Sequence, residues 1–264
     1  MTAPRQTAPT HGLRSKVPAI TLLFWVIKIV TTGMGETSSD YFVKTFDPVP
    51  VVLLAAVVFV ACLLVQLRAD RYIAWRYWLL VTMVSVFGTM VADVAHIVVG
   101  VPYAYSTAAF AAVLLVVFVL WKRSEGTLSI HSITSTRREL FYWAVVMIAF
   151  ALGTAAGDLT AMTLGMGYWA SAVLFGVVIL VPGLVFWRRP RTAVPAFWVA
   201  YIATRPFGAS IADGLAVSHT RGGLDLGTGP VSLVALGVLV VLVAIAARRP
   251  AETPLPTLAG QQLS

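Results

Sequence analysis

The chain is poor in charge and almost without cysteine. Of its 264 residues only 11% are Asp, Glu, Lys or Arg, whereas 59% are hydrophobic. A soluble domain carries about 25% charged residues. The composition therefore excludes an ordinary soluble domain and predicts an integral membrane protein. The single cysteine, Cys62, excludes an internal disulfide framework and a cysteine-based zinc site.

Catalytic signatures are missing as well. The sequence contains no Ser-His-Asp set in a plausible context, no HExxH pair and no phosphate-binding glycine loop. We therefore expect neither an enzyme nor a cofactor. The formal charge of +8 would suit nucleic acid, but the basic residues flank apolar runs, as the positive-inside rule requires. The expected partner is the lipid bilayer, not nucleic acid.

Eight apolar segments dominate the chain. Each has about 19–25 residues, which is enough to cross a hydrocarbon core of ~30 Å at 1.5 Å per residue. The sequence thus predicts an all-α integral membrane protein with eight transmembrane helices. The expected segments run roughly over 17–38, 49–67, 75–98, 103–121, 139–163, 168–187, 193–215 and 229–247.

The basic residues are distributed unevenly between the two sides of this predicted membrane domain. Fifteen of the 19 Lys and Arg residues fall at the termini and in alternate loops, all on one side. Lys44 and Arg221 fall in the opposite loops, and Lys28 and Arg205 lie within segments. By the positive-inside rule, both termini should be cytoplasmic.

The domain organisation follows from these segments. Residues 1–16 are expected to form a cytoplasmic tail and 17–247 the membrane domain. The Pro-rich end, 248–264, is expected to be a disordered cytoplasmic tail.

A single pattern occurs four times: aromatic-Trp-x9-Gly-x4-Asp, without a gap. The repeats cover about 17–67, 75–121, 139–187 and 193–247. Their shared residues are Trp25, Trp78, Trp143 and Trp198, then Gly35, Gly88, Gly153 and Gly208, then Asp40, Asp93, Asp158 and Asp213.

Each repeat contains two predicted spans, so successive repeats enter the membrane in the same orientation. They should be related by an axis along the membrane normal, which predicts a pseudo-fourfold bundle of four parallel two-helix repeats. The odd segments carry the motif, whereas the even segments are nearly featureless and should form the lipid-facing layer.

With this repeat the chain resembles bacterial membrane proteins of unknown function that are built from four tandem two-span repeats with a characteristic Trp. The resemblance covers about 17–247 and rests on the four Trp positions. It implies the eight-span architecture and a multi-pass location in the bacterial inner membrane. It implies no activity, no substrate and no oligomeric state.

Polar residues accompany the four Asp residues. One helical turn before Asp40, Asp93 and Asp158 stand Glu36, Thr89 and Thr154, on the same face of each predicted helix. This face could line a narrow polar cavity. The motif glycines point elsewhere and should let helices approach closely.

Two roles are open for the four Asp residues. They are either structural anchors near the membrane boundary or a shared site for a proton or a cation. Carboxylates and hydroxyls suit hard divalent ions such as Mn²⁺, so all four Asp residues are candidate metal ligands. Arg205 and Lys28 are expected to pair with nearby acids.

Three further features have two interpretations each. The Trp residues are either interfacial belt anchors or packed at the centre of the bundle. Pro206 either breaks its helix at a binding site or marks a packing kink. His96 is either a metal ligand or a hydrogen-bonded structural residue.

The sequence therefore predicts a transporter or channel for a small cation, either a divalent metal such as manganese or a proton-coupled solute. The predicted pathway residues are Asp40, Asp93, Asp158, Asp213, Glu36, Thr89, Thr154 and Arg205. The alternative is a non-transporting membrane scaffold in which the Asp residues only hold helices together.

Overall fold

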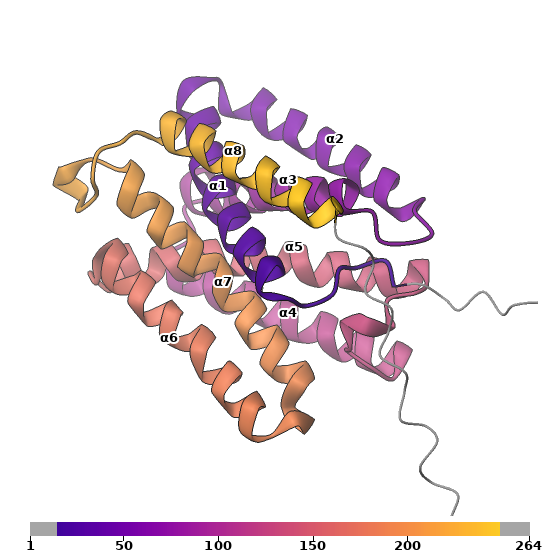
Figure 1. Ribbon diagram of the computed structural model, residues 1–264. Helices are drawn as coiled ribbons and strands as arrows, with labels where there is room; N and C mark the ends of the chain where they lie inside the picture. Colours follow the sequence, from indigo (N-terminus) through magenta and orange to yellow (C-terminus); the bar gives the residue numbers. More distant parts are fainter. Residues whose placement is uncertain (1–14, 249–264) are drawn as a thin grey trace, which may run out of the picture.

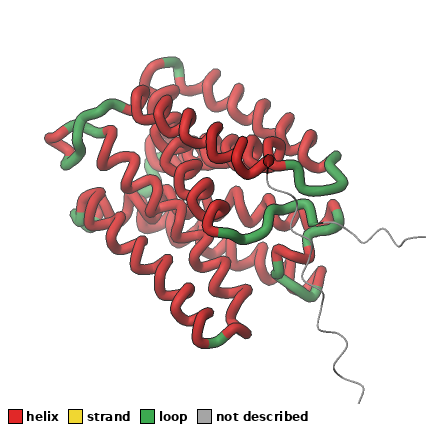
Figure 2. The backbone as a smooth tube through the Cα atoms, in the orientation of Figure 1, coloured by secondary structure: helices red, strands yellow, loops and turns green. Residues whose placement is uncertain are grey.

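The structure, a computed structural model, describes residues 15–248. In that range the regular structure is entirely helical (Figure 2). The predictions for the two tails, 1–16 and 248–264, fall almost wholly outside the described residues. The eight long helices are α1 (Leu22–Thr45), α2 (Pro48–Leu67), α3 (Ala74–Asp93), α4 (Tyr103–Glu125), α5 (Thr136–Asp158), α6 (Gly167–Arg188), α7 (Ala193–Ala216) and α8 (Thr228–Arg248).

The first helix is shifted from its predicted range of 17–38. The Thr21 side chain accepts a hydrogen bond from the Phe24 N–H at 3.3 Å, so α1 begins at Leu22, after Pro18. The helix then continues to Thr45, which places Asp40 inside it. Short segments next to the bundle are ordered too, because Lys16 is buried and its N–H donates to the Ile133 carbonyl.

The odd helices form the interior of the bundle. α1 contacts α3 and α7, and α5 contacts the same two helices. Just over half of the most apolar stretch of α3 and of α5 is buried, against 6% in α2 and α8. The predicted division into a motif-bearing interior and a featureless outer layer is what the helices show.

Each even helix packs mainly on the odd helix of the following repeat. α2 lies on α3, α4 on α5, and α6 on α7, while α8 returns to pack on α1 (Figure 1). The two helices of one repeat touch each other much less. The repeats are therefore interlocked, and the last closes on the first.

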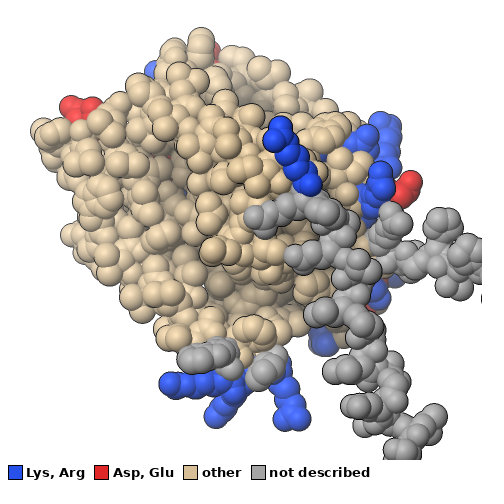
Figure 3. All heavy atoms as spheres, in the orientation of Figure 1, with Lys and Arg blue, Asp and Glu red and all other residues tan. Residues whose placement is uncertain are grey.

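The outer surface is apolar. Large side chains on the outer helices are widely exposed, among them Leu53, Val173 and Val234. Figure 3 shows a broad uncharged surface, with Lys and Arg gathered at the edge where α6 meets α7 and near the two tails. Within residues 15–248, six helices are long and apolar enough to cross a membrane: α2, α3, α4, α5, α6 and α8. These features indicate membrane insertion.

α1 and α7 differ from the other six helices in composition, not in length. Each has 24 residues and carries two buried charged residues, Lys28 and Glu36 on α1 and Arg205 and Asp213 on α7, whereas α5 carries one, Glu139. These charges lower their apolar character and concentrate polar chemistry where the two helices meet.

An aromatic layer connects the four repeats near one end of the odd helices. In each repeat the aromatic residue before the motif Trp contacts the Trp of the next repeat. The ring-centroid distances are 5.6 Å for Phe24–Trp78, 5.4 Å for Tyr77–Trp143, 6.1 Å for Tyr142–Trp198 and 5.7 Å for Phe197–Trp25. Trp78, Trp143 and Trp198 are buried and Trp25 half-buried, so the motif tryptophans pack in the interior.

The motif glycines lie at the four contacts between odd helices. A Cβ on Gly35 would stand 1.9 Å from the Ser85 hydroxyl oxygen, and one on Gly208 the same distance from that of Thr32. A Cβ on Gly153 would likewise overlap the Arg205 side chain, and one on Gly88 would stand 3.0 Å from Phe150 Cβ. In every case the partner stands three residues before the glycine of the next repeat. No side chain fits there, because the helices touch.

Candidate functional site

The four motif faces meet inside the bundle. On each odd helix the residues 4, 8, 12 and 16 positions before the repeat Asp share one face, and all of them are buried. The Asp residues that end these stripes are less enclosed. Asp213 is buried, whereas Asp40, Asp93 and Asp158 are half-buried. The buried stripe thus becomes more accessible toward the Asp end.

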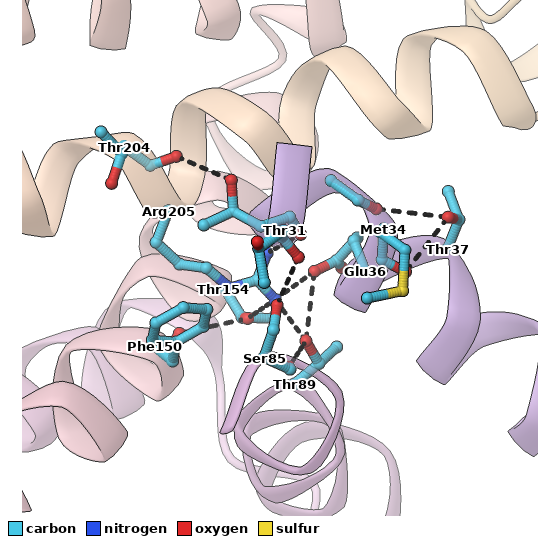
Figure 4. Close-up of polar contacts among 12 residues, drawn as sticks. Thr31, Met34, Glu36, Thr37, Ser85, Thr89, Phe150, Thr154, Thr204 and Arg205 are labelled. Atoms are coloured by element: carbon cyan, nitrogen blue, oxygen red, sulfur yellow. Dashed lines mark hydrogen bonds and ion pairs between the residues drawn. The ribbon is translucent and has the colours of Figure 1, made fainter. Parts of the chain in front are cut away.

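A buried ion pair occupies the centre of this stripe. The Arg205 Nη2 atom lies 2.5 Å from Glu36 Oε2, and the two side chains are only 1% and 6% exposed. The same nitrogen donates to the Thr154 hydroxyl at 2.8 Å and to the Thr89 hydroxyl (Figure 4). Arg205 Nη1 donates to the Thr32 carbonyl at 3.2 Å. Four predicted pathway residues are therefore in direct contact.

The hydroxyl groups around the pair are held by their own helices. Thr154 donates to the Phe150 carbonyl at 3.3 Å. Thr89 lies 2.9 Å from the Ser85 carbonyl and 3.4 Å from Glu36 Oε2. Both hydroxyls can therefore accept from the guanidinium while donating elsewhere, so they fix its position rather than compete with it.

Local sequence explains how α7 brings Arg205 to this place. Gly208 allows α1 to approach until the Thr32 hydroxyl lies 3.2 Å from the Thr204 carbonyl. Pro206 follows Arg205 and leaves the carbonyl of Ile202 without its helical donor. The helix nevertheless continues from Ala193 to Ala216, so Pro206 does not interrupt α7, contrary to the first of its two interpretations.

The repeat Asp residues stand one turn beyond the ion pair. Asp40 pairs with Lys44 on its own helix. Asp93, Asp158 and Asp213 form no side-chain hydrogen bond or ion pair with any described residue, and each stands four residues after a position of the buried stripe. This arrangement collects acidic groups at the more accessible end of the stripe.

A preformed metal site is not present in this arrangement. Within residues 15–248 no three His, Cys, Asp or Glu side chains are grouped closely enough to hold a metal ion. This finding counts against Asp40, Asp93, Asp158 and Asp213 as joint metal ligands. A single turn of π-helix follows two of these residues, at Val94–Val98 after Asp93 and at Leu159–Thr163 after Asp158. Such turns often occur at functional sites.

Lys28 does not pair with an acid, contrary to expectation. Its ammonium nitrogen lies 3.9 Å from the centre of the Phe150 ring and 4.3 Å from that of Tyr201. Glu36 is already bonded to Arg205, which explains why no carboxylate is available to it.

A second buried ion pair was not anticipated from the sequence. Lys16 Nζ lies 2.8 Å from Glu139 Oε2, and Gln66 donates to Oε1 of the same carboxylate at 2.9 Å. The only sequence signal was an acid one turn before Trp143, whose indole nitrogen lies 3.5 Å from Glu139. This pair lies beside the aromatic layer and fastens the segment before α1 to α5.

His96 has a structural role. Its Nδ1 atom lies 2.7 Å from the Val101 carbonyl, its Nε2 atom 3.1 Å from the Ser106 hydroxyl, and its ring packs on Tyr103. These contacts fix the connection between α3 and α4, in agreement with the second interpretation.

The fold and site define a class: an all-helical membrane-type bundle built from four tandem two-helix repeats. The model of the family described as Repeat of Unknown Function (DUF347) matches residues 23–72, 76–127, 141–192 and 196–251, and the chain belongs to this family. No curated protein and no solved structure matches the chain.

Proposed function

We propose that this protein is a transporter of the bacterial inner membrane for a small cation, with eight spans arranged around a pseudo-fourfold axis. The cyclic contacts of the motif aromatics and glycines support this symmetry. All four interfaces between odd helices use equivalent positions. In this arrangement α1 and α7 cross the membrane too. Their charged side chains face the interior of the bundle, because charges within a membrane are costly toward lipid.

One observation carries the proposal: Arg205 occupies a cation position built by the other repeats. Glu36, Thr89 and Thr154 stand at the same place in repeats 1, 2 and 3, four residues before the Asp. All three contact one guanidinium nitrogen from repeat 4. A carboxylate and two hydroxyls around a positive charge form a cation site, here filled by the protein itself.

The charge arrangement suggests how a solute would use this site. Acidic groups at the Asp end attract a cation, and Glu36 is the next acid inward. A cation that reaches Glu36 competes with Arg205 for the carboxylate, and release of Arg205 would loosen the contact between α1 and α7. The aromatic layer packs at the opposite end of the odd helices. Such an exchange links binding to a change in helix packing, as alternating access requires.

A proton-coupled cationic solute fits this geometry better than a divalent metal. A metal would need several oxygen ligands at once, and no group of three acidic or other ligating side chains is present among the described residues. Manganese or another divalent ion remains the second candidate substrate.

The direction of the protein in the membrane follows from its charges. The basic end with both termini is placed in the cytoplasm and the Asp end outside. The gathering of Lys and Arg at one edge in Figure 3 supports this orientation. A reporter inserted in the 68–73 loop should be cytoplasmic, and one in the loop after α7, near Thr220, periplasmic.

The test is accumulation of metals and of small organic cations by whole cells at matched expression. Asp158→Asn and Glu36→Gln should abolish accumulation without loss of membrane insertion, because they remove the charges that attract and bind the cation. Asp70→Asn is the matched control, since Asp70 is exposed in the loop between α2 and α3.

Unchanged accumulation of every cation in the Asp158→Asn and Glu36→Gln cells would reject the transport proposal. If these variants keep transport but lose association with other membrane proteins, the alternative of a non-transporting scaffold is favoured.

A further inference from the structure

The ammonium group of Lys28 lies in the interior of the bundle without a polar partner. The residue is 1% exposed. Its nitrogen forms no hydrogen bond to any described residue and faces the rings of Phe150 and Tyr201. Buried Lys side chains normally have an acid or carbonyl partner, because an isolated buried charge is costly.

No neighbouring helix supplies an acid at this depth. The positions equivalent to Lys28 are Val81 on α3, Val146 on α5 and Tyr201 on α7. Two turns further along the stripe, Glu36 is bonded to Arg205 through its Oε2 atom. The equivalent positions on the three neighbouring odd helices therefore offer Lys28 no carboxylate.

Arg205 adds a second unsatisfied donor near the same ring. Its Nε atom is buried and forms no hydrogen bond within the described residues, although both Nη atoms are bonded. Its guanidinium carbon lies 5.5 Å from the centre of the Phe150 ring, which Lys28 also contacts. Lys28 Nζ and Arg205 Nε are thus two unused donors near Phe150. Between them, the two basic side chains bond a single carboxylate within the described residues, that of Glu36.

Contacts with aromatic faces do not replace a counter-ion. A cation–π contact offsets only a small part of the cost of burying an ammonium ion. A small anion would accept hydrogen bonds from the unused donors and neutralise the excess charge.

We infer that Lys28 and Arg205 hold a small monovalent anion, either a halide ion or the carboxylate group of a solute, beside Phe150 in the bundle interior. The inference goes beyond the proposed cation transport and concerns binding alone. The four repeat Asp residues lie toward the accessible end of the bundle, and the unused donors of Lys28 and Arg205 lie deeper. This order of charges suits a solute that carries both a positive and a negative group.

The experiment measures thermal unfolding of the purified full chain in detergent at constant ionic strength. Sodium gluconate, the salt of a bulky anion, is replaced by sodium chloride or bromide in one arm and by sodium acetate in the other. Glycine, a zwitterion, is added in a further sample without removal of the gluconate salt. At a concentration roughly ten times the Kd, the bound anion should raise the Tm by about 3–6 °C. A response to halide identifies an inorganic ion, and one to acetate or glycine alone identifies a carboxylate.

Two variants make the result specific. Lys28→Met keeps the length of the side chain and should lose the response entirely while it still unfolds cooperatively. Lys44→Met removes an exposed lysine and should keep the response. The inference is overturned if no anion shifts the Tm of the wild type, or if Lys28→Met responds as fully as the wild type. Neither outcome depends on whether cells accumulate a cation.

Discussion

Two ion pairs of α1 lie one helical turn apart in very different surroundings. In the interior pair, Glu36 and Arg205 are 6% and 1% exposed. In the rim pair, the Asp40 and Lys44 side chains are 23% and 55% exposed. Loss of one interior partner leaves a buried charge, whereas loss of one rim partner leaves a charge that solvent can reach. Depth along the stripe, more than chemistry, decides what each acid contributes.

The strongest test of this comparison is Arg205→Met. Removal of the guanidinium should lower the free energy of unfolding by about 3–5 kcal/mol, because the Glu36 carboxylate remains buried without its partner. Chemical denaturation in detergent measures the loss. A further Glu36→Leu substitution should recover most of it, since Thr89 and Thr154 keep their backbone acceptors. A double variant as weak as the single one would mean that the pair does not set interior stability.

A smaller effect is expected from Gly153→Ala, which tests the helix contact beside Arg205. The added methyl carbon would stand 2.4 Å from Arg205 Cγ and 2.9 Å from Pro206 Cδ, so α5 and α7 must separate. Overpacking of this kind costs about 1–3 kcal/mol. Gly183→Ala on the outer helix α6 is the control, because no atom lies within 4 Å of its Cβ position. Equal stability of Gly153→Ala and Gly183→Ala would show that the contact between α5 and α7 accommodates an extra methyl group.

The smallest effect is expected at the rim. Lys44→Met should change the free energy of unfolding by less than about 1 kcal/mol, as exposed pairs four residues apart on a helix usually do. Denaturation at low and high salt measures it, and the small difference should disappear in high salt. A loss as large as that of Arg205→Met would mean that the rim is as enclosed as the interior.

Much of the interior could be predicted from the sequence, because the repeat fixes which positions are equivalent. The pattern predicted the eight helices, the inward odd helices and the close approach at the glycines. It also placed Glu36, Thr89 and Thr154 at one level, and named Arg205 as a partner for an acid. These features depend on helical periodicity and on spacing, which a single sequence contains.

Other features depend on the rotation of each helix and on neighbours distant in sequence. Nothing in the even segments shows that each packs on the next repeat, because their apolar faces are alike. Lys28 was expected to pair with an acid, but Glu36 on the same helix is bonded to Arg205. The Glu139 pair needed Lys16 and Gln66 from two remote segments.

The closure of the last repeat on the first has a consequence for synthesis. Glu36 and Arg205 are separated by 169 residues. At 5–20 residues per second a ribosome needs roughly 10–30 s to make that stretch. Throughout this interval α1 holds Lys28 and Glu36 without α7 and α8, which cover it in the finished molecule. α1 is therefore made well before the helices that cover it, and until then its charged side chains must be shielded by the insertion machinery or by water.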